Sequence, residues 1–94
     1  VNTNELIAYL PGFKVYPNPT MGETFTVAFD ALAEDANVVI RNTLGQEVYT
    51  TEVAANTKAN LQLSSSDFQK GIYFIDVQEL RSGKKYIAKK LIIQ

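Results

Sequence analysis

Apolar and polar residues alternate along most of this chain, and that two-residue period restricts the fold more than any other feature of the sequence. A strand shows such alternation when one of its faces is buried and the other is exposed to solvent. No long window repeats every ~3.6 residues, as an amphipathic helix would. Seven segments carry the strand pattern: residues 13–16, 23–29, 36–44, 46–54, 57–64, 71–79 and 84–94. The sequence therefore predicts an all-β protein of about seven strands.

Chain length and strand spacing together indicate the architecture. The chain has 94 residues, which suits a single domain. Its strand segments follow one another at roughly 8 to 12 residues, a spacing typical of an immunoglobulin-like antiparallel β-sandwich, with a small barrel as the alternative. We expect residues 13–94 to form the domain, and residues 1–12 to be a linker or an accessory edge segment.

The segment at residues 71–79 is the most apolar of the seven on both faces. Alternation gives it one face of Tyr73, Ile75 and Val77 and a second face of Ile72 and Phe74. A strand that is apolar on both faces is typical of the interior of a sheet. We therefore expect this segment to be a central strand.

The last segment, residues 84–94, continues to the final residue of the chain, although terminal residues usually fray unless a sheet holds them. Its apolar residues change phase, because alternation places Tyr86 on one face and both Leu91 and Ile93 on the other. An extra residue in the strand would reconcile the two phases, so we expect a β-bulge near residues 89–90.

Basic residues are concentrated in the same region. Five of the nine in the chain lie in the last 14 positions: Arg81, Lys84, Lys85, Lys89 and Lys90. Lysines on an exposed terminal strand discourage aggregation between sheet edges. A local basic cluster also suits a docking surface for an acidic partner or a membrane surface. The sequence leaves both interpretations open.

Cysteine and histidine are both absent from the chain. Thiolate and imidazole metal ligands are therefore excluded, as is any Ser-His or Cys-His pair. The acidic residues Asp30, Glu34 and Asp35 lack the alternating spacing of a calcium loop, so a solvated turn is favoured over a metal site. We expect no enzyme activity and no cofactor. The formal net charge of −1 gives no reason to expect a nucleic-acid partner.

No targeting or membrane segment is evident in the sequence. The longest apolar runs fall short of the roughly 18 residues that a membrane-spanning helix requires. Residues 1–13 lack the basic start and apolar middle of a signal peptide. Because the first residue is not methionine, we expect the chain to be the end of a longer polypeptide.

The most unusual local string is Tyr16-Pro17-Asn18-Pro19. Each proline fixes its own φ and biases the residue before it toward an extended conformation. From these restrictions alone, the string predicts a rigid corner between strands.

Four strings resemble, in order and spacing, the C-terminal sorting domain of proteins exported by the type IX (Por) secretion system. They are VYPNP at residues 15–19, NTLGQEV at 42–48, KGIY at 70–73 and KLIIQ at 90–94. The resemblance covers about residues 13–94. It implies an immunoglobulin-like sandwich that serves as the secretion and sorting signal of a larger cargo protein and has no chemistry of its own.

The resemblance also implies partners and a route. The domain would direct a folded upstream cargo from the periplasm across the outer membrane, through the outer-membrane components of the type IX system. The cargo would then reach the cell surface or the extracellular space. A cell-surface sortase would remove the domain by cutting upstream of Phe13.

Carried over residue by residue, the resemblance assigns a sorting motif. Its residues are Tyr16, Pro17, Asn18, Pro19, Gly71, Tyr73, Lys90, Leu91, Ile92 and Ile93, with Lys89 added as their neighbour. Gln94 departs from the family, whose members often end in a basic or hydroxyl residue. If the secretion machinery reads the terminal strand, we expect it to pair with the strand edge by β-augmentation.

The alternative function is an accessory or carbohydrate-binding module of a secreted enzyme. Such a module needs an exposed aromatic platform or a metal-organising loop. Tyr49, Phe74 and Tyr86 are the candidates for the platform. Exposed edge strands would also allow a homodimer.

Overall fold

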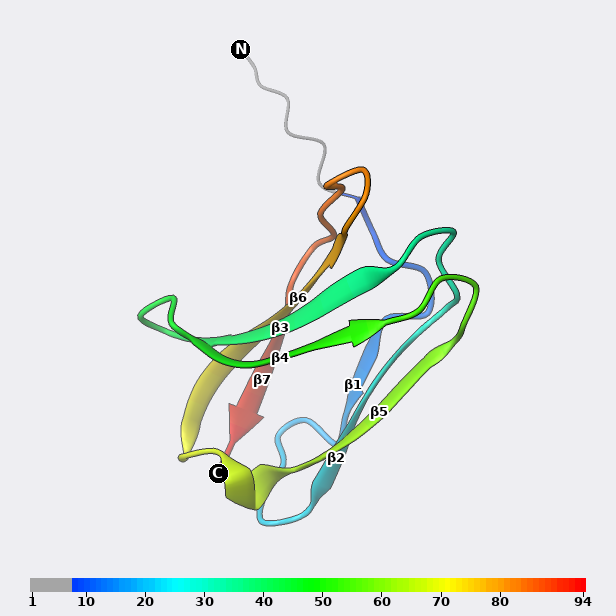
Figure 1. The fold of residues 1–94 in the computed structure, drawn as a ribbon. Helices are drawn as coiled ribbons and strands as arrows, with labels where there is room; N and C mark the ends of the chain where they lie inside the picture. The colour runs from blue at the N-terminus through cyan, green and yellow to red at the C-terminus, as the bar shows by residue number, and fades with distance from the viewer. Residues whose placement is uncertain (1–7) are drawn as a thin grey trace.

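The computed structural model describes residues 8–94 (Figure 1). This part of the chain has seven strands: β1 (Lys14–Tyr16), β2 (Thr24–Phe29), β3 (Ala36–Asn42), β4 (Glu47–Val53), β5 (Ala59–Ser64), β6 (Gly71–Glu79) and β7 (Lys89–Ile93). A single 3-10 turn, η1 (Ser65–Asp67), lies between β5 and β6. Each predicted segment contains a strand, and the all-β prediction is confirmed.

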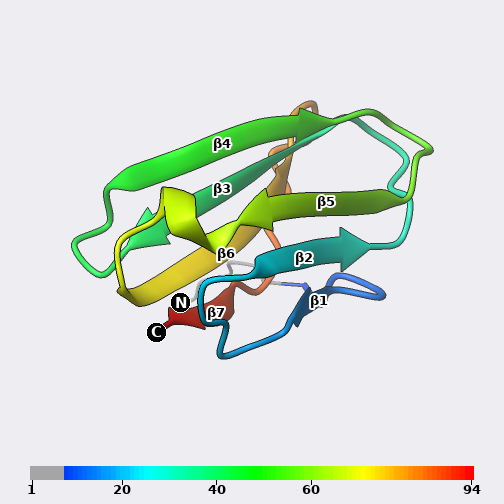
Figure 2. The same cartoon turned by 90° about the horizontal axis from the view of Figure 1, so that it is seen from below.

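The strands form two antiparallel sheets. One has three strands in the order β1-β2-β5, and the other has four in the order β4-β3-β6-β7. The two sheets lie face to face (Figure 2), which confirms the predicted immunoglobulin-like sandwich. β6 lies between β3 and β7, as predicted for the central segment, and β7 forms one edge of the larger sheet.

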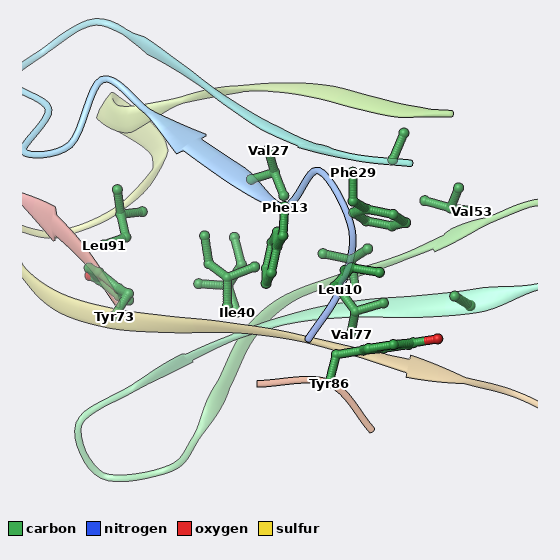
Figure 3. Close-up of a cluster of buried hydrophobic side chains, with 14 of the residues drawn as sticks. Leu10, Phe13, Val27, Phe29, Ile40, Val53, Tyr73, Val77, Tyr86 and Leu91 are labelled. Atoms are coloured by element: carbon green, nitrogen blue, oxygen red, sulfur yellow. The ribbon is translucent and has the colours of Figure 1, made fainter. Parts of the chain in front are cut away.

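The core lies between the sheets and follows the predicted alternation. The inward residues of β2 and β6 are all buried: Phe25, Val27, Phe29, Tyr73, Ile75 and Val77. Figure 3 shows several of these side chains between the ribbons, where the ring of Phe13 meets that of Phe29 edge-on. Each large apolar side chain buried in this way contributes roughly 1.5–3 kcal/mol. Apolar burial therefore dominates the contact between the sheets.

The turn between β3 and β4 is organised by Asn42. Its Oδ1 accepts hydrogen bonds from the backbone N of Leu44 at 2.9 Å and of Gln46 at 3.0 Å, a common role for asparagine in tight turns. Gly45 has a φ of 83°, which glycine adopts without steric cost. Asn42 and Gly45, both in the string at residues 42–48, thus serve the fold.

The C-terminal segment is less regular than predicted. β7 begins only at Lys89, and the residues before it are held by isolated bridges, of which Gln78 to Lys85 is one. The chain takes four steps from Lys85 to Lys89, whereas the partner strand takes three from Gln78 to Ile75. One extra residue is therefore inserted, as predicted, but upstream of residues 89–90. It allows Tyr86, Leu91 and Ile93 all to be buried.

The residues before β1 lie against the sandwich. Ala8 forms a parallel bridge with Tyr86, and Leu10 is only 6% exposed in the core (Figure 3). At residues 8–10 this arrangement is consistent with the predicted accessory edge segment. Residues 1–7 of the expected linker lie outside the described part of the chain. The domain boundary at residue 13 stays a prediction. Residues 8–94 contain no helix with the length and hydropathy of a membrane span.

Candidate functional site

The loop between β1 and β2 brings Asn18 against the backbone of β7. Asn18 Nδ2 donates a hydrogen bond to Lys90 O at 2.7 Å, and Ile92 N donates one to Asn18 Oδ1 at 3.0 Å. In a parallel ladder, the N–H and C=O of one residue bond in the same way to two residues that flank its partner. The side-chain amide of Asn18 thus substitutes for a peptide group of a neighbouring strand.

Thr20 continues this arrangement with its own backbone. Thr20 N donates to Ile92 O at 2.9 Å, and Gln94 N donates to Thr20 O at 2.8 Å, so Thr20 and Ile93 form a parallel bridge. Figure 2 shows the loop between β1 and β2 passing beside β7. The first and last strings of the predicted motif therefore form one structural unit.

A similar contact covers the segment just before β7. Ala8 N donates to Lys85 O at 3.5 Å, and Ile87 N donates to Ala8 O at 2.9 Å. The outward edge of the C-terminal segment is thus bonded at two places, by residue 8 and by residues 18–20. A partner strand that paired with β7 from residue 90 onward would have to displace Asn18 and Thr20. The edge that we expected to be read by β-augmentation is already occupied.

The rigid corner predicted for the proline string lies at this contact. Tyr16 is the last residue of β1 and is half exposed, and Pro17, Asn18 and Pro19 are exposed. Both peptide bonds that precede the prolines are cis. The string thus leads the chain from the smaller sheet to the edge of the larger one.

The side chains of β7 point in two directions. Leu91 and Ile93 are buried in the core, whereas Lys90 is exposed and Ile92 is partly exposed on the outer face of the sheet. Lys89 has the inward phase, and its Nζ lies 5.8 Å from the ring centre of Phe13, within the range of a cation–π contact. The two adjacent lysines therefore face opposite sides of the sheet.

Gly71 and Tyr73 lie on β6, where Gly71 is paired with Ile93 and Tyr73 with Leu91 of β7, so the KGIY string lies beside the last string of the predicted motif. Gly71 has a φ of 154°, a backbone conformation that residues with a Cβ rarely adopt. Tyr73 is buried, its OH donates to Gln69 O at 2.6 Å, and its ring lies 5.6 Å from that of Phe68. Both residues have a structural explanation.

The basic residues of the C-terminal segment form no ion pair within the described residues. Both ion pairs found for residues 8–94 involve Arg41, with Glu47 at 3.6 Å and Asp76 at 3.3 Å. Lys84 lies over the ring of Tyr86, with its Nζ 5.4 Å from the ring centre. Lys89 lies over the ring of Phe13, so the charges of Lys85 and Lys90 are left available to solvent or to a partner.

Two of the three acidic loop residues, Glu34 and Asp35, accept hydrogen bonds from backbone amides. Glu34 Oε1 accepts from the N of Arg81 at 3.1 Å and of Ser82 at 2.9 Å. Asp35 Oδ1 accepts from Ala55 N at 2.8 Å. These two carboxylates thus join the loop before β3 to two other loops. Within residues 8–94, no three acidic side chains gather as metal ligands would.

Glu79 and Tyr86 form a buried polar pair that was not expected from the sequence. The hydroxyl of Tyr86 donates to Glu79 Oε2, and the hydroxyl of Ser82 donates to Glu79 Oε1 at 3.0 Å. Burial raises the pKa of Tyr86 to about 12, aided by the hydrogen bond to Glu79 and by the charges of Glu79 and Glu34. Glu79 has the inward phase of β6, which is the sequence signal that could have revealed it.

The aromatic platform expected for a carbohydrate-binding module is not assembled. Tyr86 is buried, Tyr49 is half-buried with its ring 6.4 Å from that of Phe68, and Phe74 lies on the outer face of the larger sheet. The three rings do not share a surface, because Tyr49 and Tyr86 pack toward the core whereas Phe74 faces outward. These three candidates therefore form no shared platform.

Comparisons with known proteins identify both a family and a fold. The sequence model of a family described as "Secretion system C-terminal sorting domain" matches residues 14–94. Among solved structures, the chain resembles PorZ, described as an essential bacterial surface component of the type-IX secretion system of Porphyromonas gingivalis. The likeness has a TM-score of 0.66 and 23% identity and covers 88% of this chain but 11% of that one. At this identity the likeness shows the fold alone. No curated protein gave a significant match.

Proposed function

The chain belongs to the family of type IX (Por) secretion system C-terminal sorting domains, and we propose that it acts as the folded export signal of a larger cargo protein. The family assigns it a sorting role and implies export to the cell surface. The proposal adds that the domain itself performs no catalysis and serves as a substrate of the export machinery.

One observation carries the proposal. Asn18, from the first string of the predicted motif, is hydrogen-bonded to Lys90 and Ile92 of the last string. These residues lie more than 70 positions apart in the sequence. Because the contact joins them into one surface, a receptor can recognise both strings together on the folded domain.

The partners of the proposed route follow from this role. The domain carries its upstream cargo through the periplasm and engages outer-membrane components of the type IX system. A surface sortase then separates the domain from the cargo. Because Leu10 and Phe13 are buried in the sandwich, we place the cleavage site upstream of residue 8, where cutting would leave the described domain intact.

Self-association through an edge strand stays a prediction. Of the strands that end the two sheets, β7 has its outward edge bonded by Asn18 and Thr20. β4 ends the same sheet on the opposite side. β1 and β5 end the smaller sheet, so we expect any homodimer contact at β1, β4 or β5 and not at β7.

A fusion experiment tests the proposed function. The chain is attached to the C-terminus of a fluorescent reporter that carries a periplasmic signal peptide, in a host with a working type IX system. We expect the reporter at the cell surface in that host and in the periplasm of a mutant without the system. Retention of the reporter in the periplasm of the competent host contradicts the proposal.

A further inference from the structure

The position of Asn18 and Thr20 restricts how the terminal strand can be recognised. Lys90 O, Ile92 N, Ile92 O and Gln94 N all have hydrogen-bond partners in residues 18–20. β-augmentation requires free backbone groups on an exposed edge. From residue 90 onward the folded domain does not offer them, so recognition of this strand must use side chains.

Only part of the terminal motif can supply those side chains. Leu91 is fully buried and Ile93 nearly so, and both are needed to fill the core. Within residues 90–93 the accessible side chains are those of Lys90 and Ile92, which lie on the outer face of the four-stranded sheet.

On that face the neighbouring strand adds two large apolar residues. Ile72 is paired with Ile92 and Phe74 with Lys90, and Ile72 and Phe74 are 40% and 39% exposed. The N and O of Ile92 bond to Asn18 and Thr20, so Ile72 and Ile92 form a non-hydrogen-bonded pair, in which the side chains approach most closely. We call the surface of Ile72, Phe74, Lys90 and Ile92 the β6–β7 outer face.

The apolar character of this face needs an explanation. The outer faces of sandwich sheets are ordinarily polar. The core requires only the inward residues of β6 and β7, so polar side chains at positions 72, 74 and 92 would be compatible with the same core. Exposed aromatic and aliphatic side chains that adjoin one another are typical of interaction sites. The continuity of this face with the last string of the motif connects it to sorting.

Charge indicates the chemistry of the partner. Arg41 lies beside Phe74 in the next strand, but its charge is taken up by Glu47 and Asp76. Lys90 takes part in neither ion pair of residues 8–94. The charge that the β6–β7 outer face offers to a partner is therefore the ammonium group of Lys90, set among apolar side chains.

We propose that the β6–β7 outer face is the docking surface of the domain, and that an outer-membrane component of the secretion machinery binds it with an apolar patch bordered by a carboxylate. This inference rests on the proposed function and names the surface through which it operates. Asn18 is a positioning residue in this arrangement, because it holds the strand that presents Lys90 and Ile92.

Substitutions on this face test the inference in the reporter fusion. Phe74→Ser, Ile92→Ser and Lys90→Glu each alter the face, and Lys90→Arg retains the charge. Val48→Ser is the matched apolar control, since Val48 is 44% exposed on β4, at the other edge of the same sheet. Lys58→Glu, at an exposed position before β5, is the charge control.

We expect the three altering variants to reduce the surface fraction of the reporter by about fivefold or more, since central apolar and charged contacts dominate interfaces. Lys90→Arg and both controls should stay near the wild-type value. Circular dichroism melting of each purified fusion identifies variants that have unfolded. If Phe74→Ser or Ile92→Ser unfolds the domain, Lys90→Glu and its Lys90→Arg rescue decide the matter.

Each outcome distinguishes the inference from the proposed function. Failure of the wild-type fusion to reach the surface overturns the proposed function. Delivery by the wild-type fusion, together with unchanged delivery by folded Lys90→Glu, Phe74→Ser and Ile92→Ser, overturns the inference alone. Sedimentation analysis of the purified chain tests whether a second copy of the chain binds the β6–β7 outer face instead. A dimer that Phe74→Ser dissociates without loss of delivery also overturns the inference.

Discussion

The side-chain carbonyl of Asn18 accepts a hydrogen bond from the backbone N of Ile92 at 3.0 Å. The same amide group donates to Lys90 O at 2.7 Å, so one exposed side chain satisfies two backbone groups of an edge strand. Edge strands with unpaired groups invite unwanted pairing with other chains. Asn18 protects β7 from such pairing while it leaves the outer side chains of the strand accessible.

Loss of the Asn18 amide should loosen β7. We expect Asn18→Ala to lower the free energy of unfolding by about 1–2 kcal/mol, because two modest hydrogen bonds are lost. Amide hydrogen exchange at Ile92 should become about tenfold faster or more, since its N–H loses its partner. The control is Asn60→Ala, which alters an exposed asparagine of β5. Unchanged exchange at Ile92 in Asn18→Ala would contradict a protective role.

Adjacent residues of the last string should differ sharply in their effect on stability. Leu91 is fully buried, so Leu91→Ala should cost about 2–5 kcal/mol. Ile92→Ala should cost less than about 1.5 kcal/mol, because the side chain is partly exposed. Urea denaturation of both variants measures the difference. Equal losses would show that the buried and exposed residues of β7 are assigned incorrectly.

Gly71 should be required for its backbone conformation. Its φ of 154° suits glycine, and an added Cβ would meet no atom within 4 Å. Gly71→Ala should therefore lower the free energy of unfolding by about 1 kcal/mol or more through backbone strain, which corresponds to about 4 °C or more in Tm. Lys70→Ala is the neighbouring control. A Tm for Gly71→Ala that equals the wild-type value would rule out this explanation.

Stability should fall at high pH because of Tyr86. Its pKa is raised from 10.0 to about 12 in the folded protein, so between these values the folded state holds a proton that the unfolded state releases. The free energy of unfolding should therefore decrease as pH rises through this window, by roughly 2–3 kcal/mol for this group. Below pH 10 the contribution is fully present.

Tyr86→Phe provides the measurement. Urea unfolding from about pH 9 to about pH 12 should show a smaller decline for this variant than for the wild type. Tyr16→Phe, which alters a half-exposed tyrosine, should keep the full decline. Parallel curves for the wild type and Tyr86→Phe would exclude Tyr86 as the source.

The seven strands could be predicted because alternation is a local property of the sequence. The period of residues 71–79 identified both the buried face of β6 and its central position, since an edge strand has less need of a second apolar face. The phase change near the C-terminus also predicted an inserted residue. The inserted residue lies upstream of the predicted position. The sequence pattern shows that the inward phase changes, but not at which residue of the strand the bulge forms.

The Asn18 contact could not be predicted by the same means. Periodicity shows which face of a strand is buried, but not which loop lies beside its edge, and Asn18 is 74 positions from Ile92. The resemblance to a family singled out both strings without indicating that they touch. No pattern marked Thr20, whose side chain is fully buried. Its role depends on the path of the loop between two sheets.

The most direct test of the sorting role is the distribution of a reporter fused to this chain, in a host with a working type IX system. The fraction at the cell surface is compared between the full chain and a variant that lacks residues 91–94. We expect the full chain to deliver the reporter to the surface and the truncated chain to leave it in the periplasm. Equal surface delivery by the two fusions would contradict the account.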